Sequence, residues 1–156
     1  MNKTNILYLV SLLLFTFSCQ GKNIENKMIL KCIIFPTGVT SETYLIKVFE
    51  NGRFDITYGN KNNGFESDDF ESIINSKSIV LKETDLKIIK DLRSQISESK
   101  EVEKTYIKKG GWEIIVMTDG EKNHFYHGEL NDTPLGKLID ELISISPIKL
   151  DIHSWS

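Results

Sequence analysis

The sequence predicts an α+β domain: a small antiparallel sheet, built from two hairpins plus edge strands, with two amphipathic helices packed on one face. Three observations support this class: two pairs of alternating apolar segments around short turns, two segments with apolar residues at helical spacing, and an isoleucine-rich segment ahead of them. Their order is β-β-β-(β)-α-β-β-α-(β), with the less regular segments in brackets. This layout predicts that the helices lie on one side of an antiparallel sheet.

Strand patterns dominate the first half of the chain. They fall at Met28–Phe35, Thr43–Glu50, Arg53–Tyr58 and, more weakly, Ser78–Leu81. Asn51-Gly52 is the preferred pair for a type I′ hairpin turn, because both central residues of that turn need positive φ. Asp69–Ser76 fits either a short helix or a strand, so its structure stays open.

Two helices and a second hairpin follow. The first helix begins at a Thr84 cap, and the second at Asp132-Thr133-Pro134, where Asp132 is suited to capping and proline to the first turn. Their apolar stripes are Leu86, Ile89, Leu92 and Ile96 in the first, and Leu135, Leu138, Ile139, Leu142 and Ile143 in the second. Trp112–Thr118 and Glu121–His127 pair about Asp119-Gly120 between the helices, and the tail Ile148–Ser156 alternates like a strand.

The two hairpins match one another at an offset of 68 residues. Tyr44 then aligns with Trp112, and Gly52 with Gly120. Two copies are too few to establish a repeat, so true duplication and the general likeness of alternating hairpins both stay open.

The N-terminus carries an export signal. Lys3 precedes the apolar run Ile6–Phe15, and small residues lead from there to Cys19. The run is well short of the roughly 20 apolar residues that a membrane-spanning helix needs. Residues 1–18 are therefore interpreted as a secretory signal peptide, residues 19–27 as a tether and residues 28–156 as a single domain.

The segment Phe15-Thr16-Phe17-Ser18-Cys19 resembles the lipobox of bacterial lipoproteins. The resemblance covers residues 1–20 and departs at Thr16, where family members usually have leucine. It implies a diacylglyceryl group on the Cys19 thiol, cleavage just before this residue and, because Gln20 rather than aspartate follows, sorting to the outer membrane. We therefore expect an envelope protein that is anchored in the lipid bilayer through Cys19 and faces the periplasm. Thr16 and Ser18 also suit an ordinary secretory peptidase.

Composition narrows the remaining classes. The 156 residues carry a net charge of −3, with 40% hydrophobic and 26% charged residues, which fits one globular domain and argues against nucleic acid as a partner. Cys32 lies among apolar residues and fits a buried, inert thiol. Pairing with another chain or nucleophilic chemistry at Cys32 is the less favoured alternative.

Sequence motifs for catalysis or metal binding are missing. The chain contains no nucleophile elbow, zinc-protease helix, phosphate loop, dinucleotide fingerprint or cysteine-rich metal spacing. His124 and His127 are three residues apart on a strand, which sends them to opposite faces. Carboxylates at Asp68, Asp69, Glu129 and Asp132 lack the alternating ligand pattern of a calcium loop. We expect no catalytic residue, no metal ion and no cofactor.

The second face of the sheet is the candidate binding surface. Leu45, Phe49, Ile115 and Met117 alternate with the core positions, and such apolar side chains should not all face water. Either the first strand or the tail covers them, or they meet a partner, which the sequence does not identify.

Two function classes remain. The first is a membrane-anchored, non-catalytic domain that binds another protein, as an accessory, inhibitor or immunity-type protein. The second is a small-ligand binding module or an unusual hydrolase that uses His124, His127 or aspartates. A deep pocket lined by these residues would favour the second class, and a flat sheet face the first.

Overall fold

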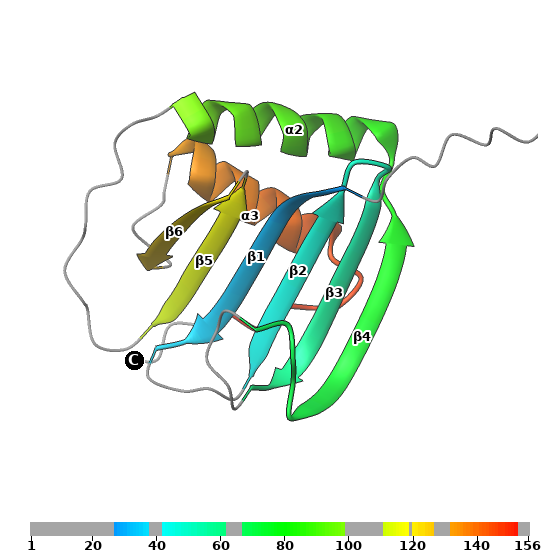
Figure 1. The fold of residues 1–156 in the computed structure, drawn as a ribbon, viewed down its shortest axis with the longest axis vertical. Coiled ribbons are helices and arrows are strands. Elements are labelled where there is room, and N and C mark those ends of the chain that lie inside the picture. Colours follow the sequence, from blue (N-terminus) through cyan, green and yellow to red (C-terminus); the bar gives the residue numbers. More distant parts are fainter. Residues whose placement is uncertain are drawn as a thin grey trace, which may run out of the picture.

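The computed structural model describes residues 27–37, 42–61, 67–98, 111–118, 120–126 and 132–152. The expected α+β class is confirmed, because within these ranges six strands form one antiparallel sheet and two helices accompany it (Figure 1). The strands are β1 (Met28–Pro36), β2 (Thr43–Phe49), β3 (Arg53–Asn60), β4 (Ser72–Val80), β5 (Trp112–Thr118) and β6 (Glu121–Tyr126). The helices are α2 (Glu83–Glu98) and α3 (Pro134–Ile145).

Strand β1 lies at the centre of the sheet, whose order is β4-β3-β2-β1-β5-β6. Cys32 on β1 opposes Ile46 on β2 and Val116 on β5. The pairs β2-β3 and β5-β6 flank this central strand, and β4 extends the first of them outward. The two edges of the sheet are therefore β4 and β6.

The turn between β2 and β3 is not the expected type I′ turn. A type I′ turn would need positive φ at both Asn51 and Gly52, but of these two only Gly52 has it, with a φ of 85°. The Gly52 amide donates to the Phe49 carbonyl at 2.9 Å, and the Asn51 side-chain oxygen accepts from the Arg53 amide at 3.0 Å. The asparagine side chain therefore stabilises a turn that needs only one left-handed residue.

Of the two structures left open for Asp69–Ser76, the strand is the one that forms from Ser72 on, and it continues through the weakly expected second strand as one long strand, β4. Its ladder with β3 runs from Val80 opposite Arg53 to Ser72 opposite Asn60, with Ile74 as an extra, bulged residue. Gly59 lies at this bulge, and a Cβ atom there would collide with the Ser72 carbonyl oxygen. Glycine is therefore needed where the two backbones approach most closely.

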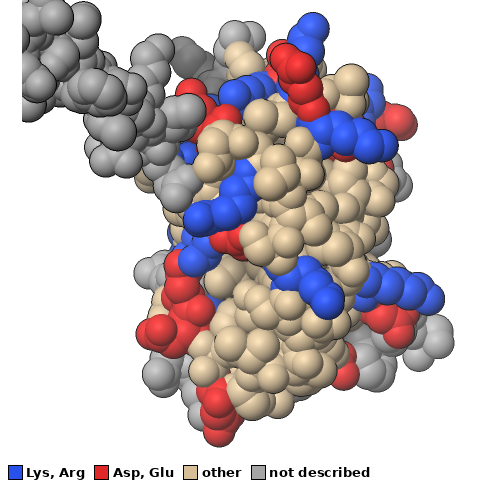
Figure 2. All heavy atoms as spheres, turned by 90° about the vertical axis from the view of Figure 1, so that its right-hand side faces the viewer, with Lys and Arg blue, Asp and Glu red and all other residues tan. Residues whose placement is uncertain are grey.

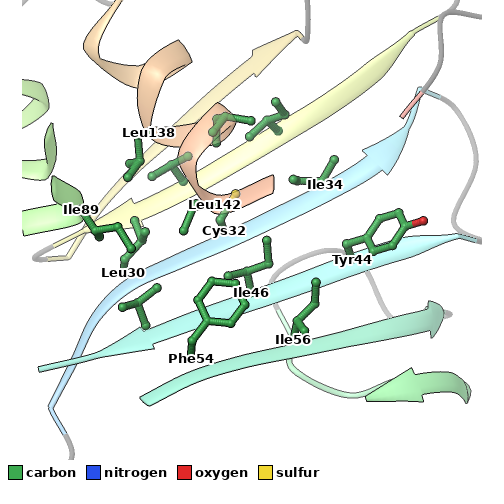
Figure 3. Packing of buried hydrophobic residues seen from close by; sticks show 14 of the residues in the cluster. Leu30, Cys32, Ile34, Tyr44, Ile46, Phe54, Ile56, Ile89, Leu138 and Leu142 are labelled. Carbon is green, nitrogen blue, oxygen red and sulfur yellow. The ribbon is translucent and has the colours of Figure 1, made fainter. Parts of the chain in front are cut away.

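Both helices pack on one face of the sheet. Their apolar stripes meet alternate residues of the strands in a core that includes Cys32, Ile46, Phe54, Ile89 and Leu138 (Figure 3). Helix α3 is capped by Thr133, whose hydroxyl accepts from the Gly136 amide at 3.0 Å. Asp132, which the sequence suggested as the cap, precedes it with a φ of 67°. None of the described helices is long and apolar enough to cross a membrane.

The tail does not form the expected strand over its described residues, which end at Ile152. Ile148 and Leu150 are nevertheless buried in the core on the helix side. The Asp151 amide donates to the Tyr44 hydroxyl at 3.2 Å. The tail is thus held by apolar burial and a side-chain acceptor, without a strand partner.

Candidate functional site

The sheet face opposite the helices, called the open face below, changes from apolar to polar across the strands. Lys47, Asp55 and Ser78 are neighbours across β2, β3 and β4, and they alternate with the buried residues that meet the helices. Nearer to β1 and β5 the open face carries isoleucine, leucine and phenylalanine instead. A partner that approaches from the β4 side would therefore meet polar groups first, and apolar groups only toward β1 and β5.

The apolar part of the open face is covered. Ile33, Phe35, Leu45 and Ile115 form a second buried cluster, against which Phe70 and Met117 pack. The proposed partner residues Leu45 and Ile115 are only 4% and 3% exposed. Of the two accounts that the sequence left open, this burial favours cover by the protein's own chain. The cover includes Phe70, whereas the first strand lies inside the sheet and the tail packs on its other face.

Phe49, the fourth residue of the proposed partner face, is also buried, at 8% exposure. The Arg53 guanidinium carbon lies 3.8 Å from the centroid of its ring. Arg53 in turn contacts the Asp55 carboxylate, with 3.1 Å between Nε and Oδ2. A cation held over an aromatic face both covers it and is attracted to it.

Two lysines of the open face share one aspartate. Lys31 and Lys47 are directly opposite one another on β1 and β2, an arrangement that like charges disfavour. The Asp68 carboxylate bridges them, with one oxygen on each ammonium group. Burial by itself would raise the pKa of Asp68, but its hydrogen bonds to Lys31 and Lys47 and their charges lower this pKa below its ordinary value. Asp68 therefore stays ionised and attaches the segment before β4 to the sheet.

Lys61 makes a second attachment for the same segment. Its ammonium group donates to the Ser67 carbonyl and lies 5.0 Å from the centroid of the Phe70 ring. Lys61 is 1% exposed, and burial, followed by the charge of Lys31, lowers its pKa. Ser67, Asp68 and Phe70 are thus each held against the sheet by contact with a lysine side chain.

A groove of about 840 Å³ lies on the open face between this attached segment and β4. Its walls carry charges of both signs, several of which are already paired with one another. It is lined by Leu45, Lys47, Arg53, Asp55, Thr57, Asp68, Asp69, Phe70, Ile73, Ser76, Lys77 and Ser78. A groove of this mixed polarity, open along a sheet edge, suits a polypeptide segment better than a compact apolar ligand.

Strand β4 forms the outer wall of the groove and the edge of the sheet. Its residues are exposed except for Ile79, and Ile73 and Val80 are 62% and 79% exposed. Lys77 is its only charged residue. Figure 2, which views this side of the molecule, shows mostly uncharged surface with scattered basic and acidic side chains. An edge strand of this kind presents a row of backbone donors and acceptors to any chain that approaches it.

His124 lies elsewhere on the sheet and pairs with Glu113. Its Nε2 is 2.6 Å from Glu113 Oε2, and its ring centroid is 6.3 Å from that of Phe35. A carboxylate that orients an imidazole is a component of many hydrolytic sites, but neither residue lines the groove. In the described part of the chain no group of three or more His, Cys, Asp and Glu residues could hold a metal ion. His127 and Glu129 lie outside the described residues.

Of the two cysteines, the structure describes only Cys32. Cys32 is fully buried, and this burial raises the pKa of its thiol to about 12. A thiol with such a pKa is almost entirely protonated at neutral pH and reacts slowly. Cys19, the expected lipid attachment point, lies outside the described residues.

Sequence reasoning missed the lysine–aspartate bridge and the groove. The signal was a lysine in each of two otherwise apolar strands, at Lys31 and Lys47, on the face opposite the helices. Asp68 was considered only as a loop carboxylate, because nothing local to it indicates which strands it reaches. Comparison of the chain with protein-family models, curated proteins and solved structures finds no match.

Proposed function

We propose that the protein is a lipid-anchored envelope protein whose domain binds an extended segment of another protein, without catalysis. The segment adds to the sheet as a seventh strand beside β4. Its side chains on the open-face side lie along the rim that β4 forms, and long ones reach over this rim into the groove. Strand addition of this kind takes its affinity from backbone hydrogen bonds and its specificity from pockets for alternate side chains.

The observation that carries the proposal is the coincidence of the β4 edge with the groove. Asn75–Val80 form a regular ladder with β3 beyond the bulge, so their outer side offers an ordered template. Ser76 and Ser78 already bond to residues of β3, with 3.3 Å to the Ile56 carbonyl and 2.6 Å to the Asp55 carboxylate. These bonds hold β4 in place before any partner arrives, which lowers the entropy cost of binding.

The alternative, an unusual hydrolase, has one supporting observation, the Glu113–His124 pair. That pair is separate from the groove, so a hydrolase would need its substrate elsewhere on the open face. Loss of a slow hydrolytic activity in His124→Gln, with strand addition intact, would favour this alternative.

Binding is tested with peptides selected from a random display library on the purified protein. Selected peptides should slow amide hydrogen exchange at alternate residues of Asn75–Val80, because only the outward N–H groups gain a partner. Residues of β6 should exchange as before and provide the internal control. Peptides that protect β6 or the helices and leave β4 unchanged would contradict the proposal.

The anchor is tested separately by feeding cells labelled fatty acid. The wild-type protein should incorporate the label and fractionate with membranes, whereas Cys19→Ser should do neither, since Cys19 supplies the thiol for acylation. A wild-type protein without label, or a mutant that still fractionates with membranes, would contradict the anchor and leave the binding test unaffected.

A further inference from the structure

The start of β1, the end of β4 and helix α2 lie at the same end of the domain (Figure 1), and each of the three carries one exposed apolar residue. Met28 is 44% exposed, Val80 79% and Ile88 43%. They belong to three different elements, so no single strand or helix pattern accounts for them. We refer to this region as the β1-start end.

Backbone contacts bring these elements together. The Glu50 amide donates to the Lys27 carbonyl at 2.9 Å, which fixes the start of β1 beside the β2-β3 turn. The Leu81 amide donates to the Gly52 carbonyl at 2.9 Å, which fixes the end of β4 beside the same turn. The turn is thus the common neighbour of the elements that carry Met28 and Val80.

Each exposed apolar side chain has a lysine within two positions. Lys27 precedes Met28, Lys82 follows Val80 and Lys87 precedes Ile88. None of these three lysines forms an ion pair with another described residue. An apolar side chain beside a lysine suits the boundary between lipid chains and headgroups, where the lysine stem lies along the apolar layer and its ammonium reaches the phosphates.

We propose that the β1-start end rests on the bilayer that holds the acylated Cys19, with Met28, Val80 and Ile88 at the lipid boundary. The inference rests on the proposed anchor. Residues 20–27 span at most about 28 Å, and they join the domain at Lys27, beside Met28. This end is therefore the part of the domain closest to the attachment point along the chain. Glu50 and Glu83 also lie here, so the contact depends on apolar side chains rather than on net positive charge.

Such an orientation has a consequence for the groove. Ile73, at the opposite end of β4 from Val80, would point away from the bilayer. The membrane would then block the Val80 end of β4. A segment of another protein would approach β4 from its Ile73 end, on the periplasmic side.

The experiment uses the full acylated protein on vesicles of phosphatidylethanolamine and phosphatidylglycerol that contain brominated lipid. An environment-sensitive fluorophore is attached to Met28→Cys, Val80→Cys or, as the matched control on the same strand, Ile73→Cys. Cys19 is acylated and Cys32 is fully buried with a raised pKa, so neither competes for the label. Flotation of the vesicles first establishes that the protein is attached.

Quenching and a blue shift at positions 28 and 80, with neither at position 73, are the expected result. A second substitution, Ile88→Asp, should reduce the quenching at position 28 without preventing flotation. Flotation with equal quenching at positions 73 and 80 would overturn the orientation and leave the anchor standing. Protein that does not float would contradict the anchor and, with it, this inference. A label at position 80 that lipid does not quench, but that an added envelope protein shields, would assign this end to a protein and overturn the inference.

Discussion

The two edges of the sheet differ in the features that control strand addition. β6 has six residues, of which Glu121 and Lys122 are charged and His124 can be charged near neutral pH, whereas β4 has nine residues and a single charge at Lys77. Short length and charge are common devices that prevent one sheet from pairing with another. β4 has a bulge at Ile74, but the six residues beyond it are regular. This sheet therefore restricts pairing at β6 and permits it along most of β4.

The largest difference in stability is expected between two aspartate substitutions, one at a buried apolar residue of the open face and one at an exposed apolar residue of the β4 edge. Phe49→Asp places a carboxylate at a buried position under Arg53, and we expect it to lower the free energy of unfolding by about 3 kcal/mol or more. Val80→Asp, at a position that is 79% exposed, should lower it by less than about 0.5 kcal/mol. Urea unfolding of the two variants measures both values. Equal losses of unfolding free energy in the two variants would mean that Phe49 is as accessible to solvent as Val80.

The next largest effect is expected at Asp68, in the segment that faces β4 across the groove. Asp68→Asn leaves Lys31 and Lys47 facing one another without a bridging charge, and we expect a loss of about 1 to 3 kcal/mol, limited by the partial exposure of Asp68. Asp69→Asn is the matched control, because Asp69 bonds to the Ser67 hydroxyl and not to the lysines. A loss as large in the control would assign the effect to the segment as a whole.

The pH dependence of this loss has a defined sign. The pKa of Asp68 is lower in the folded protein than in the unfolded chain, so its contribution is fully present above the unfolded value of about 3.9. It disappears as pH falls through the lowered folded value. Wild type and Asp68→Asn should therefore differ at neutral pH and converge in strong acid, as measured by unfolding at a series of pH values. A difference that grew on acidification would contradict the ion-pair account.

A proline series along β4 sharpens the comparison of the two edges. Alternate residues direct their N–H groups toward β3 and toward solvent, so Ser76→Pro and Lys77→Pro should behave differently. The variant that removes an outward donor should fold normally and bind selected peptides at least about tenfold less tightly, or about 1.4 kcal/mol. Its neighbour should lose a ladder bond and unfold more readily. Two variants with the same binding and stability would contradict strand addition.

The smallest effect is expected at β6. His124→Gln removes an exposed partner of Glu113, and we expect a stability change below about 1 kcal/mol with peptide binding unchanged. Calorimetry of binding and thermal unfolding test both parts. Weaker peptide binding in this variant would indicate that the peptide binds near β6 rather than at β4.

The sequence was sufficient for the fold class and for the two helices, because their apolar stripes have a clear period. It was less informative where a tertiary contact decides the outcome. Asn51-Gly52 indicated a turn, but not that the Asn51 side chain would bond the backbone and keep its φ negative. β4 was ambiguous because it is exposed on nearly all sides and so lacks the alternation that burial imposes.

The candidate site was harder to predict than the fold, for a physical reason. Leu45 and Ile115 were correctly placed opposite the helices, but the cover of the cluster that they form includes Phe70, a residue far from both in the sequence. The Asp68 bridge likewise joins residues from two strands and a loop. Periodicity reports which face a strand residue occupies, and it carries no information on which loop crosses that face.

The most direct test of the central claim compares the two edges in living cells. A photo-reactive amino acid is placed at Ile73 or Ser76 on β4, and at Glu121 or Asn123 on β6, in otherwise wild-type protein. If strand addition occurs at β4, the β4 positions should give a discrete cross-linked product that the outward-facing proline variant abolishes, and the β6 positions should give none. Equal products from both edges, or a β4 product that survives the proline substitution, would contradict strand addition at β4.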